Sequence, residues 1–264
     1  MERDIDYESE EETFSDTSRE EHMQRKPHKG RNIIWEESIS LTELFACPLA
    51  ISCFRHHSCY EFCEMVERVK FHHELSQLFV THLHNGQVNL AGVSFILSPT
   101  TISEATGIPN VGEQWNKGQY VDREHYDPYI KARYHNKISR VFPFKYLDNS
   151  FAPLMKLIIK YFTCEGRFSR LYAYNIRLLM HFTRVRMMNI PYFIYKNIEK
   201  MAHYVQRKPF PQQLSNIYHF SLIKIVVLHQ LNLQNIPWET FIAHEMFKGP
   251  QVSLVPQEEG GPSG

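Results

Sequence analysis

The densest group of chemically versatile side chains lies in the sequence CFRHHSCYEFC, residues 53–63. Three cysteines and two histidines fall there: Cys53, His56, His57, Cys59 and Cys63. Thiolates and imidazoles are the usual ligands of zinc, and the last two cysteines would share one face of a helix. The segment has no Cys-x-x-Cys pair and no second spaced ligand pair. Two hypotheses therefore remain. The segment is either a metal site, or its cysteines are small buried thiols and its histidines lie at the surface. No cofactor is predicted.

Aromatic and basic side chains alternate in a second segment, WNKGQYVDREHYDPYIKARYHNKISR, residues 115–140. The candidate nucleic-acid-binding residues there are Trp115, Lys117, Tyr120, Arg123, Lys131, Arg133, Tyr134, Lys137 and Arg140. Rings that stack on bases, beside cations that pair with phosphates, hold single-stranded nucleic acid without sequence preference. The alternative is a loop whose aromatic rings attach it to the core while its charges remain in water.

Arginines are concentrated in a third segment, on a helix predicted from Ser169 to Arg186. The candidates are Arg167, Arg170, Arg177, Arg184 and Arg186. Such a helix would present either a surface for a polyanion or an ordinary solvated face.

Catalytic motifs are absent from the sequence. The phosphate-binding patterns GxGxxG and GxxxxGK[ST] do not occur, and neither do GxSxG or HExxH. Two-metal phosphoryl transfer needs several converging carboxylates, yet after Asp16 the only aspartates are Asp122, Asp127 and Asp148. We therefore predict that the chain is not an enzyme. A remnant of a metal-dependent transposase or nuclease is the remaining catalytic alternative, and it requires three carboxylates to converge in space.

Among the elements that must position these groups, residues 87–113 form the most consistent unit. Val93, Phe95 and Leu97 alternate as in a strand. Ser98 suits the N-cap of a short helix that begins at a proline, and Gly107 suits its left-handed end. The pattern predicts a strand or hairpin, a tight turn and a two-turn helix.

Helical periodicity dominates the rest of the chain. Apolar spacing of three and four residues predicts helices at 72–84, 150–163, 169–186, 191–206, 215–231 and 237–248. The helix at 215–231 is apolar on nearly all sides and is predicted to be the central core helix. The fold class is therefore mainly α-helical, with a short β-hairpin or small sheet near residues 87–97 and a disordered acidic N-terminus.

Charge divides the chain into two unequal parts. Residues 1–21, here called the acidic segment, hold ten acidic side chains and two arginines, a net charge of −8. Because the whole chain is neutral, the remainder carries +8. The segment can fold back and screen the basic part, or the basic part can contact a polyanion. No apolar run reaches the ~20 residues of a membrane span, and scattered cysteines suit an intracellular protein of the nucleus or cytoplasm.

Several stretches resemble a family of plant mobile-element proteins, the putative plant transposon or retrotransposon-derived domains. They are LFVTHLHNGQVNLAGVSFILSPTTISEATGIPNVGEQW, residues 78–115, IPYFIYKNIEKM, residues 190–201, YHFSLIKIVVLHQL, residues 218–231, and IPWETFI, residues 236–242. The resemblance implies an origin and a fold family, and it carries over no catalytic residue. It implies a single mostly helical domain over residues 31–249, with subregions 31–115 and 150–249 joined by the aromatic-basic connection. Residues 1–30 are expected to form an acidic, then basic, disordered tail, and residues 250–264 a flexible tail.

The expected function is protein association or self-assembly by a non-enzymatic domain derived from a plant transposon or retrotransposon. The alternative is a nucleic-acid-binding module that uses residues 115–145 and the arginine-rich segment 167–186, with RNA or DNA as the partner. The membrane is not an expected partner.

Overall fold

The computed structural model describes residues 47–70, 72–115, 126–137, 141–164, 170–184, 187–207, 219–244 and 247. Helices predominate in these ranges, and the strands form two small antiparallel sheets, so the mainly α-helical fold class is confirmed. The α-helices are α3 (Pro48–His56), α4 (Tyr60–Arg68), α5 (His73–Thr81), α6 (Pro99–Thr106), α7 (Ala152–Ile158), α8 (Ala173–Phe182), α9 (Ile190–Gln206), α10 (Phe220–Leu233) and α11 (Trp238–Ile242). The strands are β1 (Gln87–Leu90), β2 (Val93–Ile96), β3 (Val141–Pro143) and β4 (Arg170–Tyr172).

The hairpin and the short helix predicted around residues 87–113 are present. Strands β1 and β2 pair with Val88 opposite Phe95, and both of these side chains are fully buried. Ser98 then begins α6 in a reciprocal capping box with Thr101, whose main-chain N–H donates to the Ser98 hydroxyl at 3.1 Å. Gly107 ends the helix with a φ of 74°, as the left-handed cap requires.

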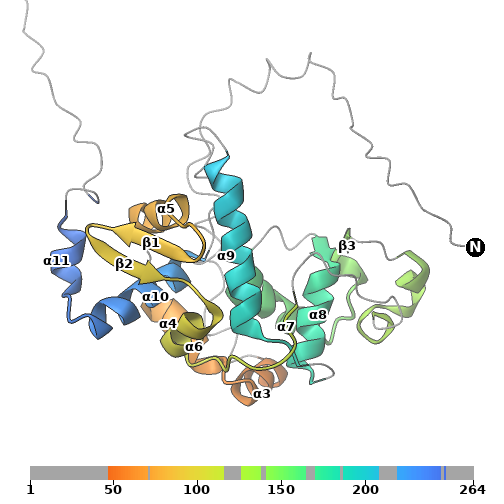
Figure 1. Cartoon of the computed structure of the whole chain (residues 1–264). Helices are drawn as coiled ribbons and strands as arrows, with labels where there is room; N and C mark the ends of the chain where they lie inside the picture. Colours follow the sequence, from red (N-terminus) through yellow and green to blue (C-terminus); the bar gives the residue numbers. More distant parts are fainter. Residues whose placement is uncertain are drawn as a thin grey trace, which may run out of the picture.

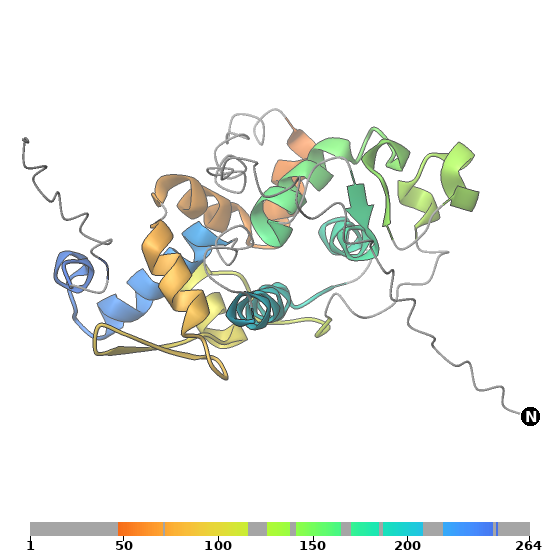
Figure 2. The same ribbon diagram turned by 90° about the horizontal axis from the view of Figure 1, so that it is seen from above.

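Helix α9 stands in the middle of the molecule (Figure 1). The hairpin, α5 and α10 lie on one side of it, and α7 and α8 lie on the other, as the view nearly along α9 also shows (Figure 2). Helices α5 and α6 pack against both α9 and α10. Gln230 of α10 ties this layer to the hairpin, because its side-chain amide accepts from the Ile96 N–H at 2.8 Å and donates to the Ile96 carbonyl at 2.9 Å.

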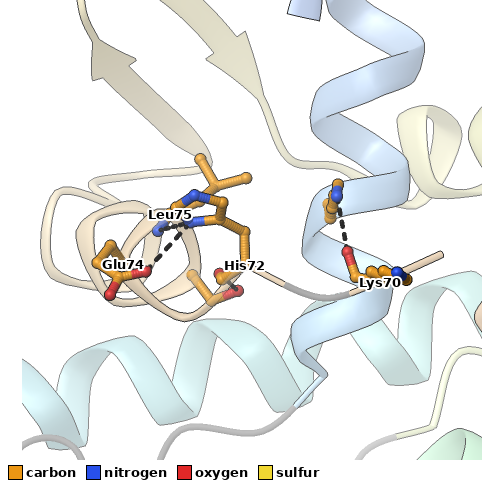
Figure 3. Close-up of polar contacts among 6 residues, drawn as sticks. Lys70, His72, Glu74 and Leu75 are labelled. Atoms are coloured by element: carbon orange, nitrogen blue, oxygen red, sulfur yellow. Dashed lines mark hydrogen bonds and ion pairs between the residues drawn. The ribbon is translucent and has the colours of Figure 1, made fainter. Parts of the chain in front are cut away.

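The link between α4 and α5 shows how local side chains begin a helix (Figure 3). The imidazole of His72 acts as the N-cap of α5, accepting from the Leu75 N–H at 3.2 Å, and its Nδ1 lies 3.4 Å from a Glu74 carboxylate oxygen. From α10, the Lys224 ammonium donates to the Lys70 carbonyl at 2.6 Å. A distant helix therefore fixes the end of α4.

The region after α6 differs from the sequence prediction in three places. The helix predicted at 237–248 is shorter, because α11 ends at Ile242. The helix predicted at 169–186 is shorter, because residues 170–172 form strand β4, which pairs with β3 at Phe142 and Leu171. Both of these side chains are buried, so each short strand contributes one apolar residue to the core. The predicted 150–163 helix is α7 followed by a π-helical turn, Ile159–Thr163.

Buried side chains from the subregions 31–115 and 150–249 belong to one hydrophobic core. Phe54 of α3, for example, packs edge-on against Phe162 at a centroid distance of 5.8 Å and lies 4.8 Å from the Phe182 ring. The predicted tails, residues 1–30 and 250–264, lie outside the described residues. Among the helices in the described ranges, none is long and apolar enough to cross a membrane.

Candidate functional site

The cysteine–histidine segment occupies α3, a short turn and the start of α4. Cys53, Cys59 and Cys63 are all buried, and burial raises the pKa of each thiol above its ordinary value. Thiols in this state are protonated and are poor ligands and nucleophiles. Across the described part of the chain, no group of three His, Cys, Asp or Glu side chains is placed to hold a metal ion. The five candidate residues therefore do not form a metal site with one another.

The two histidines of this segment separate at the end of α3. His56 is exposed, whereas His57 is only 5% exposed, so the hypothesis of two surface histidines is wrong for the second. The His57 ring lies against the ring of His181 from α8, with centroids 4.1 Å apart and an interplanar angle of 36°. His181 is 3% exposed. Two imidazoles from distant helices are therefore in contact in the interior.

The hydrogen bonds of these rings are incomplete. Nδ1 of His181 accepts from the Met188 main-chain N–H at 2.9 Å, which places the proton of the neutral ring on Nε2. That Nε2 is buried and has no hydrogen-bond partner, and neither ring nitrogen of His57 has one. Buried polar groups are normally paired, and leaving one unpaired costs about 1–3 kcal/mol. The pair therefore presents unsatisfied donors and an unsatisfied acceptor.

Electrostatics keep both rings neutral. Burial lowers the pKa of His57 to about 4, and the nearby His56 ring and Arg184 guanidinium act in the same direction. Carbonyl groups of Phe182 and His181 favour its protonated form, but neither reaches hydrogen-bond geometry with the ring. Burial lowers the pKa of His181 to about 3, with its histidine neighbours as the next cause. Both imidazoles are therefore uncharged at neutral pH in the described state.

The rings of His57 and His181 form part of the wall of a pocket of about 70 Å³. We call it the histidine pocket, and its lining is His56, His57, Ser58, Ile108, Pro109, Val111, His181, Met187, Met188 and Ile190. Val111 is 59% exposed and Met187 is 45% exposed, which makes the rim apolar. On the scale of about 10–15 Å³ per water, this volume holds a few waters. It fits the tip of a side chain and is far below the ~300 Å³ of a typical small-molecule site.

Two loop segments meet to form the rim of the histidine pocket. The Glu113 N–H donates to the Met187 carbonyl at 3.1 Å, and the Asn189 N–H donates to the Glu113 carbonyl at 2.9 Å. Gly112 permits this approach, because its φ is 102° and a Cβ there would lie 2.8 Å from the Met188 carbonyl carbon. The backbone thus holds Val111 and Met187 at the same pocket.

Two of the predicted nucleic-acid-binding residues lie in the interior. Trp115 is 2% exposed and stacks on Phe193 at a centroid distance of 6.0 Å. Arg177 is 4% exposed, its guanidinium lies 5.6 Å from the Trp115 ring centroid, and it donates to the Glu113 carboxylate at 2.7 Å. Both residues face protein groups, so assigning them to an exposed interface is wrong. The alternative of an aromatic ring that attaches the loop to the core holds for Trp115.

The arginine-rich segment does not form one helical face in the described residues. Arg170 lies in β4, Arg177 is buried in α8, and Arg184 is exposed just after α8 with a φ of 67°. Lys117, Tyr120, Arg123, Arg140, Arg167 and Arg186 lie outside the described residues, and the side chain of Lys137 does too.

The remaining aromatic-basic candidates do come together. Tyr134 and Tyr146 stack with centroids 4.0 Å apart, and the Arg133 guanidinium lies 4.8 Å from the Tyr134 ring centroid. The Lys131 ammonium donates to the Lys145 carbonyl at 3.1 Å. We call these five residues the tyrosine-stack surface, because Arg133 and Lys145 are exposed and both rings are half-buried. Tyr146 was not among the sequence candidates, although it directly follows Lys145 in the sequence.

Two further polar contacts escaped the sequence prediction because their partners are far apart in the chain. The buried Lys160 ammonium pairs with the Glu67 carboxylate, which also accepts from the Tyr161 hydroxyl at 2.8 Å. The Cys164 thiol lies 3.3 Å from Nδ1 of His219 and 3.0 Å from the Lys160 carbonyl. Within the described residues, the cavity beside this thiol is about 10 Å³, room for one water. It holds no substrate-sized space.

Comparison of the chain with protein-family models, with curated proteins and with solved structures finds no match. The histidine pocket and the tyrosine-stack surface are the features of the described residues that bear on function.

Proposed function

We propose that this chain is a non-enzymatic association module that binds a second copy of itself, derived from a plant mobile element as its sequence resemblance implies. One observation carries the proposal. Exposed Val111 and Met187 flank a pocket whose buried imidazole nitrogens have no hydrogen-bond partner. A protein surface that inserts a polar side chain there satisfies the nitrogens and removes the apolar rim from water in the same step.

The rim has the composition of an interface centre. Methionine is enriched at such centres and adapts to different partners, because its unbranched side chain can change rotamer. Val111 and Met187 belong to loop segments that the backbone fixes against each other, so little order is lost when a partner binds. A small pocket in a rigid apolar rim suits the anchor residue of a protein partner.

Charge favours a second copy as that partner. The acidic segment carries −8 and the remainder carries +8. Opposite charges on different parts of one chain attract two copies in a head-to-tail orientation, and a net charge of zero removes the repulsion that keeps many proteins apart.

Sedimentation velocity of the full chain over a wide concentration range tests this proposal. We expect reversible self-association, weakened about 30-fold by the double substitution Val111→Ser and Met187→Ser. Losing the burial of two partly exposed apolar side chains removes ~2 kcal/mol of binding, and every ~1.4 kcal/mol is tenfold in Kd. The matched control is Leu233→Ser, which removes a side chain that is 65% exposed and lies on α10, outside the pocket lining. A chain that stays monomeric, or a double variant that associates as tightly as the control, overturns the proposal.

Binding of single-stranded nucleic acid is the second candidate function, and the tyrosine-stack surface favours it. Stacked rings next to exposed cations are the elements that hold single strands. We expect the paired substitutions Arg133→Ala and Lys145→Ala to weaken binding to labelled single-stranded RNA or DNA, and to reduce the slope of log Kd against log salt by roughly one to two. A slope that is unchanged in this variant excludes the surface.

A further inference from the structure

The unsatisfied hydrogen-bonding groups of the histidine pocket define the chemistry of what binds there. Nε2–H of His181 is a buried donor without an acceptor, and the neutral His57 ring carries one more donor on either nitrogen. Two N–H groups from neighbouring rings can be accepted by the two oxygens of one carboxylate. Among the described residues that line the pocket, none is acidic. The Phe182 and His181 carbonyls act on His57, but this lining supplies no carboxylate.

Nearby positive charge selects for the same ligand. The titratable and charged groups that act on the two rings are His56 on α3, the other ring of the pair, and Arg184 at the end of α8. Arg184 is exposed, so its guanidinium can attract an anion from solvent. All of these groups oppose protonation of the two rings, and an incoming carboxylate would reverse that balance.

We infer that the histidine pocket binds a carboxylate side chain of the acidic segment, residues 1–21. This inference rests on the proposed association function and names the part of the chain that enters the pocket. The segment supplies ten carboxylates, and some have apolar neighbours that suit the rim, as Asp6 does between Ile5 and Tyr7. Residues 22–46 can span roughly 80 Å when extended, so the segment reaches a pocket on its own copy or on a neighbouring one.

Binding is coupled to proton uptake. When a carboxylate enters, His57 takes one proton from solvent and becomes an imidazolium that donates to it, while His181 donates through Nε2–H. The buried positive charge is then compensated by the carboxylate. The pKa of His57 is therefore higher in the bound state than in the free state. Between these two pKa values, the affinity of the pocket for the segment increases as the pH falls.

Nuclear magnetic resonance of the histidine ring protons tests the inference on the full chain. The natural chain is compared with a full-length variant in which the ten acidic residues of the acidic segment are replaced by Asn or Gln. Single substitutions His57→Gln and His181→Gln assign the two ring signals. A synthetic peptide of residues 1–21 is then added to the neutralised variant, and a peptide with the same ten replacements serves as the control.

We expect the titration midpoint of His57 to be at least one pH unit higher in the natural chain than in the neutralised variant. The acidic peptide restores the high midpoint, and the control peptide does not. Equal midpoints in both chains, with no response to the acidic peptide, overturn the inference. Sedimentation separates this result from the proposed function. A chain that self-associates with equal midpoints keeps that function without this contact, whereas a monomer with a raised midpoint keeps the contact within one copy.

Discussion

The ion pair between Glu67 and Lys160 gives the sharpest stability prediction. The Lys160 side chain is 2% exposed, and its ammonium lies in the π-helical turn after α7, paired with a carboxylate from α4. Replacing Glu67 by Gln keeps the shape of the side chain but removes the negative charge that this carboxylate places beside the buried ammonium. Breaking a buried pair in this way costs about 3–5 kcal/mol.

The structure places the expected effect at the lower end of that range. Glu67 is 23% exposed, so water reaches the site and can solvate part of the charge. The Tyr161 hydroxyl keeps a hydrogen bond to the remaining amide oxygen, because burial raises the pKa of this phenol and keeps it protonated. We therefore expect Glu67→Gln to lower the free energy of unfolding by about 3 kcal/mol. This is a large part of the ~5–15 kcal/mol of a typical domain.

Urea unfolding at pH 7, followed by circular dichroism, measures this change through the midpoint and slope. The matched control is Glu64→Gln on the same helix. Glu64 lies 3.5 Å from Arg68, whose side chain is 75% exposed, so its loss is expected to cost less than ~1 kcal/mol. Adding Lys160→Met to Glu67→Gln removes the buried positive charge and should restore most of the lost stability. A loss below ~1 kcal/mol for Glu67→Gln, or no recovery in the double variant, refutes the reasoning.

Three further predictions follow from the same structure. Burial lowers the pKa of His57 from 6.5 to about 4 and that of His181 from 6.5 to about 3, so the unfolded chain binds more protons than the folded chain below pH 6.5. In the variant with the neutralised acidic segment, urea unfolding should therefore show a free energy of unfolding that falls as the pH drops from 6.5 toward 4. A free energy that does not change over this range contradicts the prediction. Cys59 is fully buried, whereas Cys164 is half-buried. Alkylation followed by mass spectrometry should therefore label Cys164 in the folded chain and Cys59 only after unfolding. Equal labelling rates for the two thiols would contradict the burial of Cys59. Ser98→Ala removes the N-cap of α6 and should lower the free energy of unfolding, measured by urea unfolding, by ~1 kcal/mol. The control is Ser94→Ala at an exposed position, and an effect of Ser98→Ala no larger than that of the control would refute the prediction.

The histidine pocket and the tyrosine-stack surface differ in what they require of a partner. The pocket is small, apolar at its rim and lined by neutral imidazoles, so it suits one inserted side chain. The tyrosine-stack surface is open and carries exposed cations, so it suits an extended anionic strand. The sedimentation and salt-series experiments separate these two modes of association.

Local interactions are what the sequence by itself determined. Alternation of apolar residues predicted the hairpin, and Ser98 and Gly107 predicted both ends of α6, because a cap joins groups only a few residues apart. The helix predicted at 191–206 is α9, and Pro191 lies in its first turn as expected. The apolar character of α10 likewise predicted its place in the core, since such a helix must be buried on nearly all sides.

Contacts between distant segments were decided only by the tertiary structure. The sequence places His57 and His181 far apart, and no local pattern indicates that α3 and α8 bring their rings together. Burial of Arg177 depended in the same way on Glu113 and Trp115 reaching it from another segment. A side chain's periodicity shows which face of a helix it occupies, whereas its exposure and pKa depend on what packs against that face. The helices could therefore be predicted from the sequence, whereas the histidine pocket could not.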